Sequence, residues 1–167
     1  MVTLGMPNST FLVALDTGSD LFWVPCDCQQ CAPTLFNGDG YRKCSGAAAV
    51  CPYEVAYVST DTSSSGVLVE DVLHLMTEDT HPEVVDVRII FGCGQVQTGS
   101  FLDAAAPNGL FGLGMSKMSV PSILASAGII SDSFSMCFGK DGVGRISFGD
   151  KGSSDQGETP FNVNQLQ

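Results

Sequence analysis

The residues best suited to chemistry lie near the start of the chain, at Asp16, Thr17, Gly18 and Ser19. They follow residues 11–15, a nearly continuous apolar run that predicts a buried strand closed by a turn. An ionised carboxylate at the end of a buried strand is unfavourable unless hydrogen-bond donors compensate it. Gly18 lets the backbone fold tightly, and the neighbouring amides and hydroxyls can donate to Asp16. The stretch therefore predicts one acid held in a fixed, donor-rich place, which is typical of catalysis.

The tripeptide at residues 16–18 also has an ordinary structural interpretation. Asp-x-Gly after a strand is a common turn sequence that only ends the strand. On these three residues alone, the turn is the simpler interpretation. The residues that follow favour the catalytic one.

A longer motif continues through Ser19-Asp20-Leu21-Phe22-Trp23-Val24-Pro25, with a tryptophan five residues after Gly18. Together with the apolar run, this motif resembles the first active-site loop of the pepsin-like aspartic proteases. The continuation Cys26-x-Cys28-x-x-Cys31 is similar to the plant branch of that family, the nepenthesin-like or atypical aspartic proteases. The resemblance extends from about residue 2 to the end of the chain. It implies that residues 1–167 form the N-terminal lobe of such a protein, with the first strand truncated.

The composition predicts a folded domain rich in strands. Of the 167 residues, 44% are hydrophobic and only 15% are charged, which argues against disorder. The 19 glycines and the scarcity of helical periodicity favour short strands and turns. The family resemblance implies a mainly all-β fold, in which twisted antiparallel sheets close into a partial barrel with one or two short helices.

The charge and hydropathy exclude several partners. A net charge of −11 argues against nucleic acid or an anionic membrane surface. No apolar run is long enough to span a membrane. No signal peptide is visible, because residues 1–5 open the chain with neither a basic region nor a long apolar run. Because the cysteine pattern is that of a secreted protein, we expect an incomplete N-terminus and a secretory or extracellular location.

Seven cysteines occupy positions 26, 28, 31, 44, 51, 93 and 137. A zinc site would need a second ligand pair at matching spacing, but Cys44 and Cys51, like His74 and His81, are seven residues apart. Disulfides are therefore the better interpretation, although their connectivity does not follow from the sequence. The odd number leaves at least one thiol without a partner inside the chain. The segment from Cys31 to Cys51 is short for the plant family, so some family disulfides are expected to be missing.

A predicted hairpin consists of a strand over residues 51–58, a polar turn over residues 59–66 and a strand over residues 67–75. In isolation it is an ordinary surface hairpin. Beside the Asp16 motif it resembles the pepsin-family flap, with Tyr57 at the flap-tyrosine position. The resemblance implies that Trp23 packs behind the flap and hydrogen-bonds Tyr57 through its indole nitrogen. Val58 and Ser59 replace the glycines usual in the family after this tyrosine.

The segment Leu110-Phe111-Gly112 resembles the family's second element, a strand that passes beneath the catalytic loop, where the glycine permits close backbone approach. A nucleotide loop is the alternative for this glycine-rich stretch, but neither the Gly-x-Gly-x-x-Gly spacing nor a following Lys-Ser or Lys-Thr is present. Residues 119–128 predict a short helix with a serine cap, and residues 134–149 predict a further hairpin.

The family resemblance implies hydrolysis of a polypeptide substrate at acid pH, with no cofactor and no metal. Asp16 matches the first of two catalytic acids, but no second Asp-Thr-Gly or Asp-Ser-Gly occurs. We therefore expect a chain that is inactive alone and needs a partner, either a C-terminal lobe or a second copy of itself. The alternative is a catalytically inactive lobe that binds a protein or peptide, as an inhibitor does.

Overall fold

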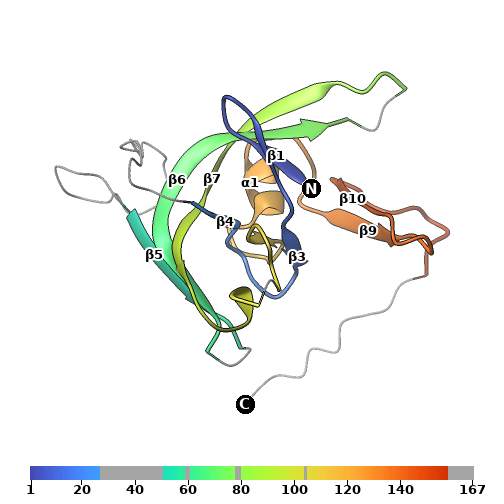
Figure 1. Ribbon diagram of the computed structural model, residues 1–167. Helices are drawn as coiled ribbons and strands as arrows, with labels where there is room; N and C mark the ends of the chain where they lie inside the picture. Colours follow the sequence, from blue (N-terminus) through green and yellow to red (C-terminus); the bar gives the residue numbers. More distant parts are fainter. Residues whose placement is uncertain (27–50, 59–60, 78–79, 104, 158–167) are drawn as a thin grey trace, which may run out of the picture.

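A computed structural model describes residues 1–26, 51–58, 61–77, 80–103 and 105–157 (Figure 1). The strands, the 3-10 helix η1 and the α-helix follow one another as β1 (Val2–Leu4), β2 (Ser9–Phe11), β3 (Ala14–Asp16), β4 (Trp23–Pro25), β5 (Cys51–Ala56), β6 (Ser63–Met76), β7 (Val84–Gln97), η1 (Gly99–Phe101), β8 (Leu110–Gly112), α1 (Val120–Ser126), β9 (Phe134–Phe138) and β10 (Gly144–Phe148). The predicted mainly β fold is confirmed.

Most strands belong to one eight-stranded sheet in the order β2-β1-β6-β7-β4-β8-β3, with β5 paired to β6. The long strands β6 and β7 curve strongly, and α1 lies on the inner side of their curve in Figure 1. Among the described strands the sheet is open, with β2 and β3 at its two ends, so it does not close into a barrel. Most strand pairs are antiparallel, as expected, and two are parallel: β3 pairs with β8, and β4 with β7.

The run at residues 11–15 is not one buried strand, contrary to the sequence prediction. It is split between β2 and β3, and Leu12 and Leu15 are 55% and 45% exposed. Asn108 is the cause of the break. The side-chain oxygen of Asn108 accepts a hydrogen bond from the backbone amide of Leu12 at 2.8 Å. The backbone amide of Asn108 donates to the Leu12 carbonyl at 3.1 Å. Leu12 therefore bonds to a distant loop instead of to a sheet neighbour.

The hairpin of β5 and β6 is longer than predicted, and its turn is shorter. Residues 63–66 belong to β6 instead of the turn, and a register shift between Ser65 and Gly66 marks a bulge against β7. Ser63 and Ser64 can lie in a strand because their hydroxyls form hydrogen bonds with side chains of neighbouring segments. The hydroxyl of Ser63 lies 2.8 Å from that of Thr98, and fully buried Ser64 bonds to Tyr53.

The core lies between the concave side of the sheet and α1. Phe22 is fully buried, with its ring centroid 4.8 Å from that of Phe111 and 5.6 Å from that of Phe91. Val120 and Leu124 of α1 complete this cluster. The predicted helix is confirmed, because the Ser119 side chain caps its first turn by accepting from the Ser122 amide.

The predicted C-terminal hairpin is also confirmed. Strands β9 and β10 pair in an antiparallel register from Phe134 and Phe148 to Phe138 and Gly144, and they form a sheet of their own. In the described part of the chain, no helix is long and apolar enough to cross a membrane.

Candidate active site

Asp16 is the last residue of β3, and two donors from the following loop hold its half-buried carboxylate. The Gly18 amide donates to Oδ1 at 2.9 Å, and the Ser19 hydroxyl donates to Oδ2 at 2.6 Å. One donor on each oxygen fixes the plane of the carboxylate. Thr17, expected as a further donor, is exposed and forms no hydrogen bond to Asp16 among the described residues.

The loop after Asp16 is fastened to β8 by backbone hydrogen bonds. Leu113 donates its amide to the Asp16 carbonyl at 2.8 Å, and Gly114 donates to the Ser19 carbonyl at 2.9 Å. Gly112 stands opposite Asp16 in the parallel register of β3 and β8. A Cβ atom on Gly112 would collide with the backbone carbonyl of Asp20, so this strand passes directly under the loop. The close approach expected of Leu110, Phe111 and Gly112 is therefore present.

Tyr57, the residue after the hairpin strand β5, lies near the same loop. The fully buried Trp23 donates its Nε1 hydrogen to the Tyr57 hydroxyl at 2.9 Å, which is the hydrogen bond expected from the sequence. The Tyr57 hydroxyl also lies near the Ser19 side chain, and Ser19 in turn bonds to Asp16. Burial raises the pKa of Tyr57, so its hydroxyl stays protonated at acid and neutral pH. The row of side chains Trp23, Tyr57 and Ser19 thus leads from the core to the carboxylate, with hydrogen bonds at its two ends.

Phe101 and Asp20 support this row of side chains, and sequence reasoning missed both. The ring of Phe101 stands edge-on to Trp23 and to Tyr57, with centroids 5.0 and 5.2 Å away. It belongs to the short helix η1, far along the chain, and no motif surrounds it. Asp20 accepts a hydrogen bond from the Ser116 amide at 2.9 Å, which joins the active-site loop to the turn after β8. Its position within the Asp-Thr-Gly-Ser-Asp sequence was the available signal.

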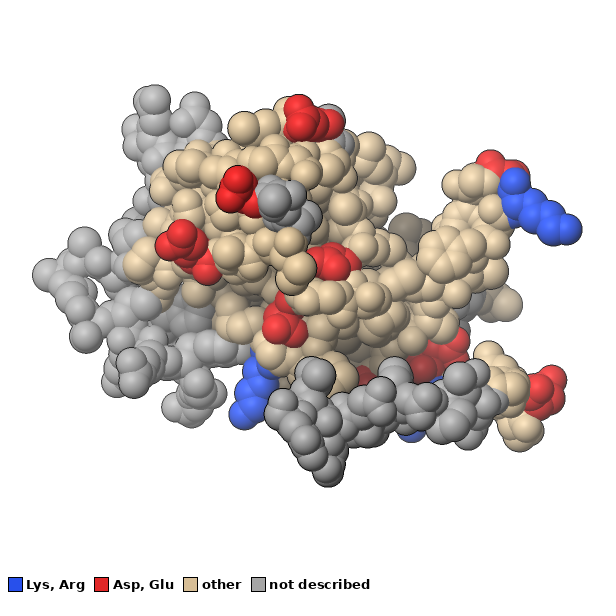
Figure 2. Space-filling model, turned by 90° about the horizontal axis from the view of Figure 1, so that it is seen from below, with Lys and Arg blue, Asp and Glu red and all other residues tan. Residues whose placement is uncertain are grey.

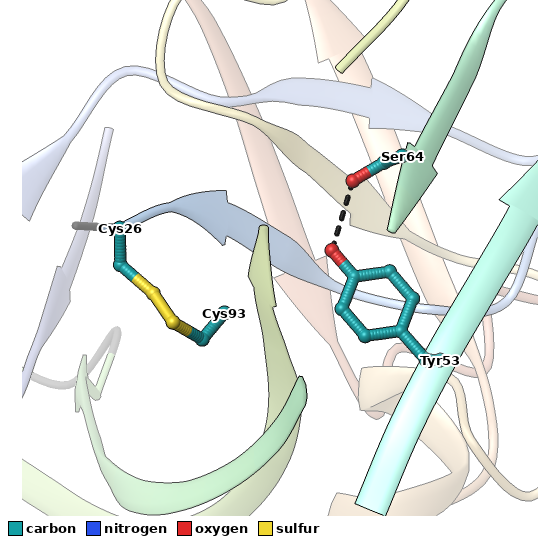
Figure 3. The surroundings of a disulfide bond; sticks show 4 residues. All are labelled: Cys26, Tyr53, Ser64 and Cys93. Carbon is teal, nitrogen blue, oxygen red and sulfur yellow. Dashed lines mark hydrogen bonds between the residues drawn. A yellow bond between two sulfur atoms is a disulfide. The ribbon is translucent and has the colours of Figure 1, made fainter. Parts of the chain in front are cut away.

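A disulfide and a second tyrosine tie together the strands next to β4 (Figure 3). Cys26, just after β4, is bonded to Cys93 of β7, with the two Cα atoms 5.4 Å apart. Tyr53 of β5 reaches the Ser64 hydroxyl at 2.8 Å (Figure 3), and burial raises the pKa of Tyr53 to about 12. The prediction of disulfides is confirmed by the bonded Cys26 and Cys93, and Cys51 is also disulfide-bonded.

Four cysteines remain besides Cys26, Cys51 and Cys93. Cys28, Cys31 and Cys44 lie outside the described residues. Cys137 of β9 is a free, exposed thiol. No group of three or more potential metal ligands occurs in the part of the chain that the structure describes.

On the face drawn in Figure 2, acidic side chains are scattered among uncharged ones, and basic side chains lie toward the margins.

Comparison with known proteins places this geometry in a family. The model of the family described as "Xylanase inhibitor N-terminal" matches residues 29–150, which is more than half of the chain. The chain belongs to this family. The chain's curated relatives include plant proteins named as aspartic proteases, so the predicted membership in the plant branch of the pepsin-like aspartic proteases is confirmed.

Two relatives from Arabidopsis thaliana are similar over almost the whole chain. "Aspartyl protease family protein 1" is 52% identical over 192 residues, and "Aspartic proteinase-like protein 1" is 42% identical over 196 residues. The alignments cover 98% and 96% of this chain but only 37% of each relative. This member of the xylanase inhibitor N-terminal family therefore spans a little over one third of the length of these relatives.

Solved structures show the same fold. Conglutin gamma from lupine seeds matches 90% of the chain, with a TM-score of 0.66 and 21% identity, over 45% of its own length. The protein named edgp matches 89% of the chain, with a TM-score of 0.67 and 24% identity, over 41% of its own length. At such low identity, these structures support the fold of the family member and nothing finer.

Proposed function

We propose that this chain is the flap-bearing N-terminal lobe of an aspartic endopeptidase and that Asp16 is one of its two catalytic carboxylates. The observation that carries the proposal is the fixed carboxylate of Asp16, held by Gly18 and Ser19 and overlaid by Tyr57. Relatives named as aspartic proteases support it. The second carboxylate comes from a C-terminal lobe or from a second copy of the chain.

In the proposed reaction, Asp16 and the second acid share one proton, because two carboxylates so near each other cannot both be ionised. The ionised member takes a proton from a bound water, and the protonated member polarises the carbonyl of the scissile peptide bond. Ser19 keeps the plane of Asp16 fixed throughout. Tyr57 closes over the polypeptide, and Trp23 holds its hydroxyl in place.

The proposed location is the secretory pathway or the extracellular space. The disulfide between Cys26 and Cys93 supports it, because structural disulfides persist in oxidising compartments. An acidic compartment would also supply the shared proton that the mechanism needs.

The test is cleavage of a denatured protein at acid pH, by the chain alone and by the chain combined with a C-terminal lobe from a relative. We expect the combination to be active, and a pepstatin-type inhibitor should block this activity. Asp16→Asn should lower kcat/KM by at least about a hundredfold. Phe138→Ser, on an exposed position of β9 remote from Asp16, is the matched control and should leave the activity unchanged.

Cleavage that survives Asp16→Asn would refute the catalytic role of this residue. A second candidate function is a non-catalytic lobe that binds a protein or peptide, and the description of the matching family as an inhibitor family favours it. Absence of cleavage in every combination, together with tight binding of the chain to a xylanase, would support that candidate instead.

A further inference from the structure

The turn between β1 and β2 carries a motif that the proposed catalytic site does not use. Asn8-Ser9-Thr10 is the only Asn-x-Ser/Thr triplet in the 167 residues, and the central residue is not proline. We propose that Asn8 is an N-glycosylation site and that its glycan covers the free edge of β2. The ligand class is an N-linked oligosaccharide.

The local geometry leaves the motif open to solvent. Asn8, Ser9 and Thr10 are all exposed, and Asn8 ends the turn that begins at Gly5. Strand β2 starts at the next residue, with Ser9 opposite Leu4 in the register. The Asn8 side chain forms no hydrogen bond to any described residue, so a glycan on its amide nitrogen would break no interaction described here.

The disulfides indicate the compartment in which this modification occurs. Cys26 and Cys93 are bonded, and Cys51 is bonded as well, which is typical of proteins that fold in the secretory pathway. There the side-chain nitrogen of Asn8 attacks the anomeric carbon of a lipid-pyrophosphate-linked oligosaccharide. The new carbon–nitrogen bond replaces the carbon–oxygen bond to the pyrophosphate. The nitrogen loses one proton, and the lipid pyrophosphate leaves with the bonding electrons, so no oxidant or reductant is needed.

The position of Asn8 gives the glycan a structural role. Strand β2 ends the order of the large sheet, and no strand in the described ranges pairs with its outer side. Such an edge presents unpaired backbone groups on which another chain can add a strand. Met6 in the same turn is 72% exposed and adds apolar surface beside the edge. A bulky, hydrated oligosaccharide at the first position before β2 would obstruct edge-to-edge association.

The test is expression with secretion from a eukaryotic cell, followed by treatment with an amidase specific for N-linked glycans. We expect a mobility shift in the wild type and conversion of Asn8 to aspartate in its peptide mass spectrum. Asn8→Gln and Thr10→Ala should abolish the shift completely. Thr10→Ser, the matched control, keeps the triplet and should keep the shift.

An unmodified Asn8 in the secreted, disulfide-bonded wild type would overturn the assignment, as would a shift that survives Asn8→Gln. The role at the edge has its own readout, which is sedimentation at equal protein concentration. The Asn8→Gln protein should have a severalfold larger self-associated fraction than the glycosylated wild type. Equal fractions would refute the shielding of β2. None of these measurements depends on proteolytic activity, so they are independent of the proposed function.

Discussion

Gly112→Ala tests whether the close passage of β8 under the active-site loop holds Asp16 in place. The added Cβ would collide with the carbonyl group of Asp20 and would lie 2.8 Å from the amide nitrogen of Leu21. Both obstacles are backbone atoms, which cannot rotate away as the end of a flexible side chain can. The strand and the loop must therefore move apart.

The cost follows from the contacts that this separation disturbs. Overpacking in a well-packed site costs about 1–3 kcal/mol. The hydrogen bonds from Leu113 to Asp16 and from Gly114 to Ser19 flank the collision, and weakening them costs up to about 1 kcal/mol each. We expect Gly112→Ala to lower the free energy of unfolding by about 2–4 kcal/mol, a large share of the stability of a typical domain. A displacement of Asp16 by about 1 Å would also lower the proposed activity about a hundredfold.

Urea unfolding followed by tryptophan fluorescence measures the change, since the single Trp23 is fully buried next to the loop. Gly157→Ala is the matched control. Its added Cβ would meet no atom within 4 Å, so the free energy of unfolding should change by no more than about 0.5 kcal/mol. If Gly112→Ala costs no more than Gly157→Ala, the loop does not depend on this close approach and the reasoning fails.

Two further predictions concern residues outside the Asp16 loop. His74 faces two acceptors, the Gly5 carbonyl at 3.0 Å and the Asp86 carboxylate at 2.7 Å, and these hydrogen bonds raise the pKa of His74 above its ordinary 6.5. The stabilisation that His74 provides should therefore be complete below pH 6.5 and decline as the pH rises through the higher pKa of the folded state. In urea unfolding across this range, His74→Gln should differ most from the wild type at low pH, and a difference independent of pH would contradict the prediction. Tyr53→Phe should lower the free energy of unfolding by about 1–2 kcal/mol, because fully buried Ser64 loses its hydrogen-bond partner. In a double-mutant cycle with Ser64→Ala, strictly additive changes in the free energy of unfolding would contradict a direct interaction between the two side chains.

Local chemistry was sufficient to identify several elements from the sequence. Ser119 and Pro121 mark the start of α1, because a cap and a proline act on their own turn. The hairpin of β9 and β10 follows from a short polar turn between two alternating segments. The hydrogen bond from Trp23 to Tyr57 was expected only from the family resemblance, since 34 residues separate the two positions.

Other features depend on residues that are distant in the sequence and could not be read from a local pattern. The apolar residues 11–15 predicted a continuous buried strand, but Asn108 interrupts it and leaves Leu12 exposed. The serines at 63–65 looked like a turn, because their partners Thr98 and Tyr53 were unknown. In each case a distant side chain supplied a hydrogen bond that changed the local preference.

The active-site loop shows both contributions together. Residues 16–19 carry their own donors, so the hydrogen bonds from Gly18 and Ser19 to Asp16 are encoded within four consecutive positions. Their placement is not encoded there, since it requires parallel pairing with β8, the bond from Cys26 to Cys93 and the ring of Phe101. Contacts between neighbours in sequence have few competing arrangements, whereas pairing across 67 or more residues is chosen from many by the burial of the whole core.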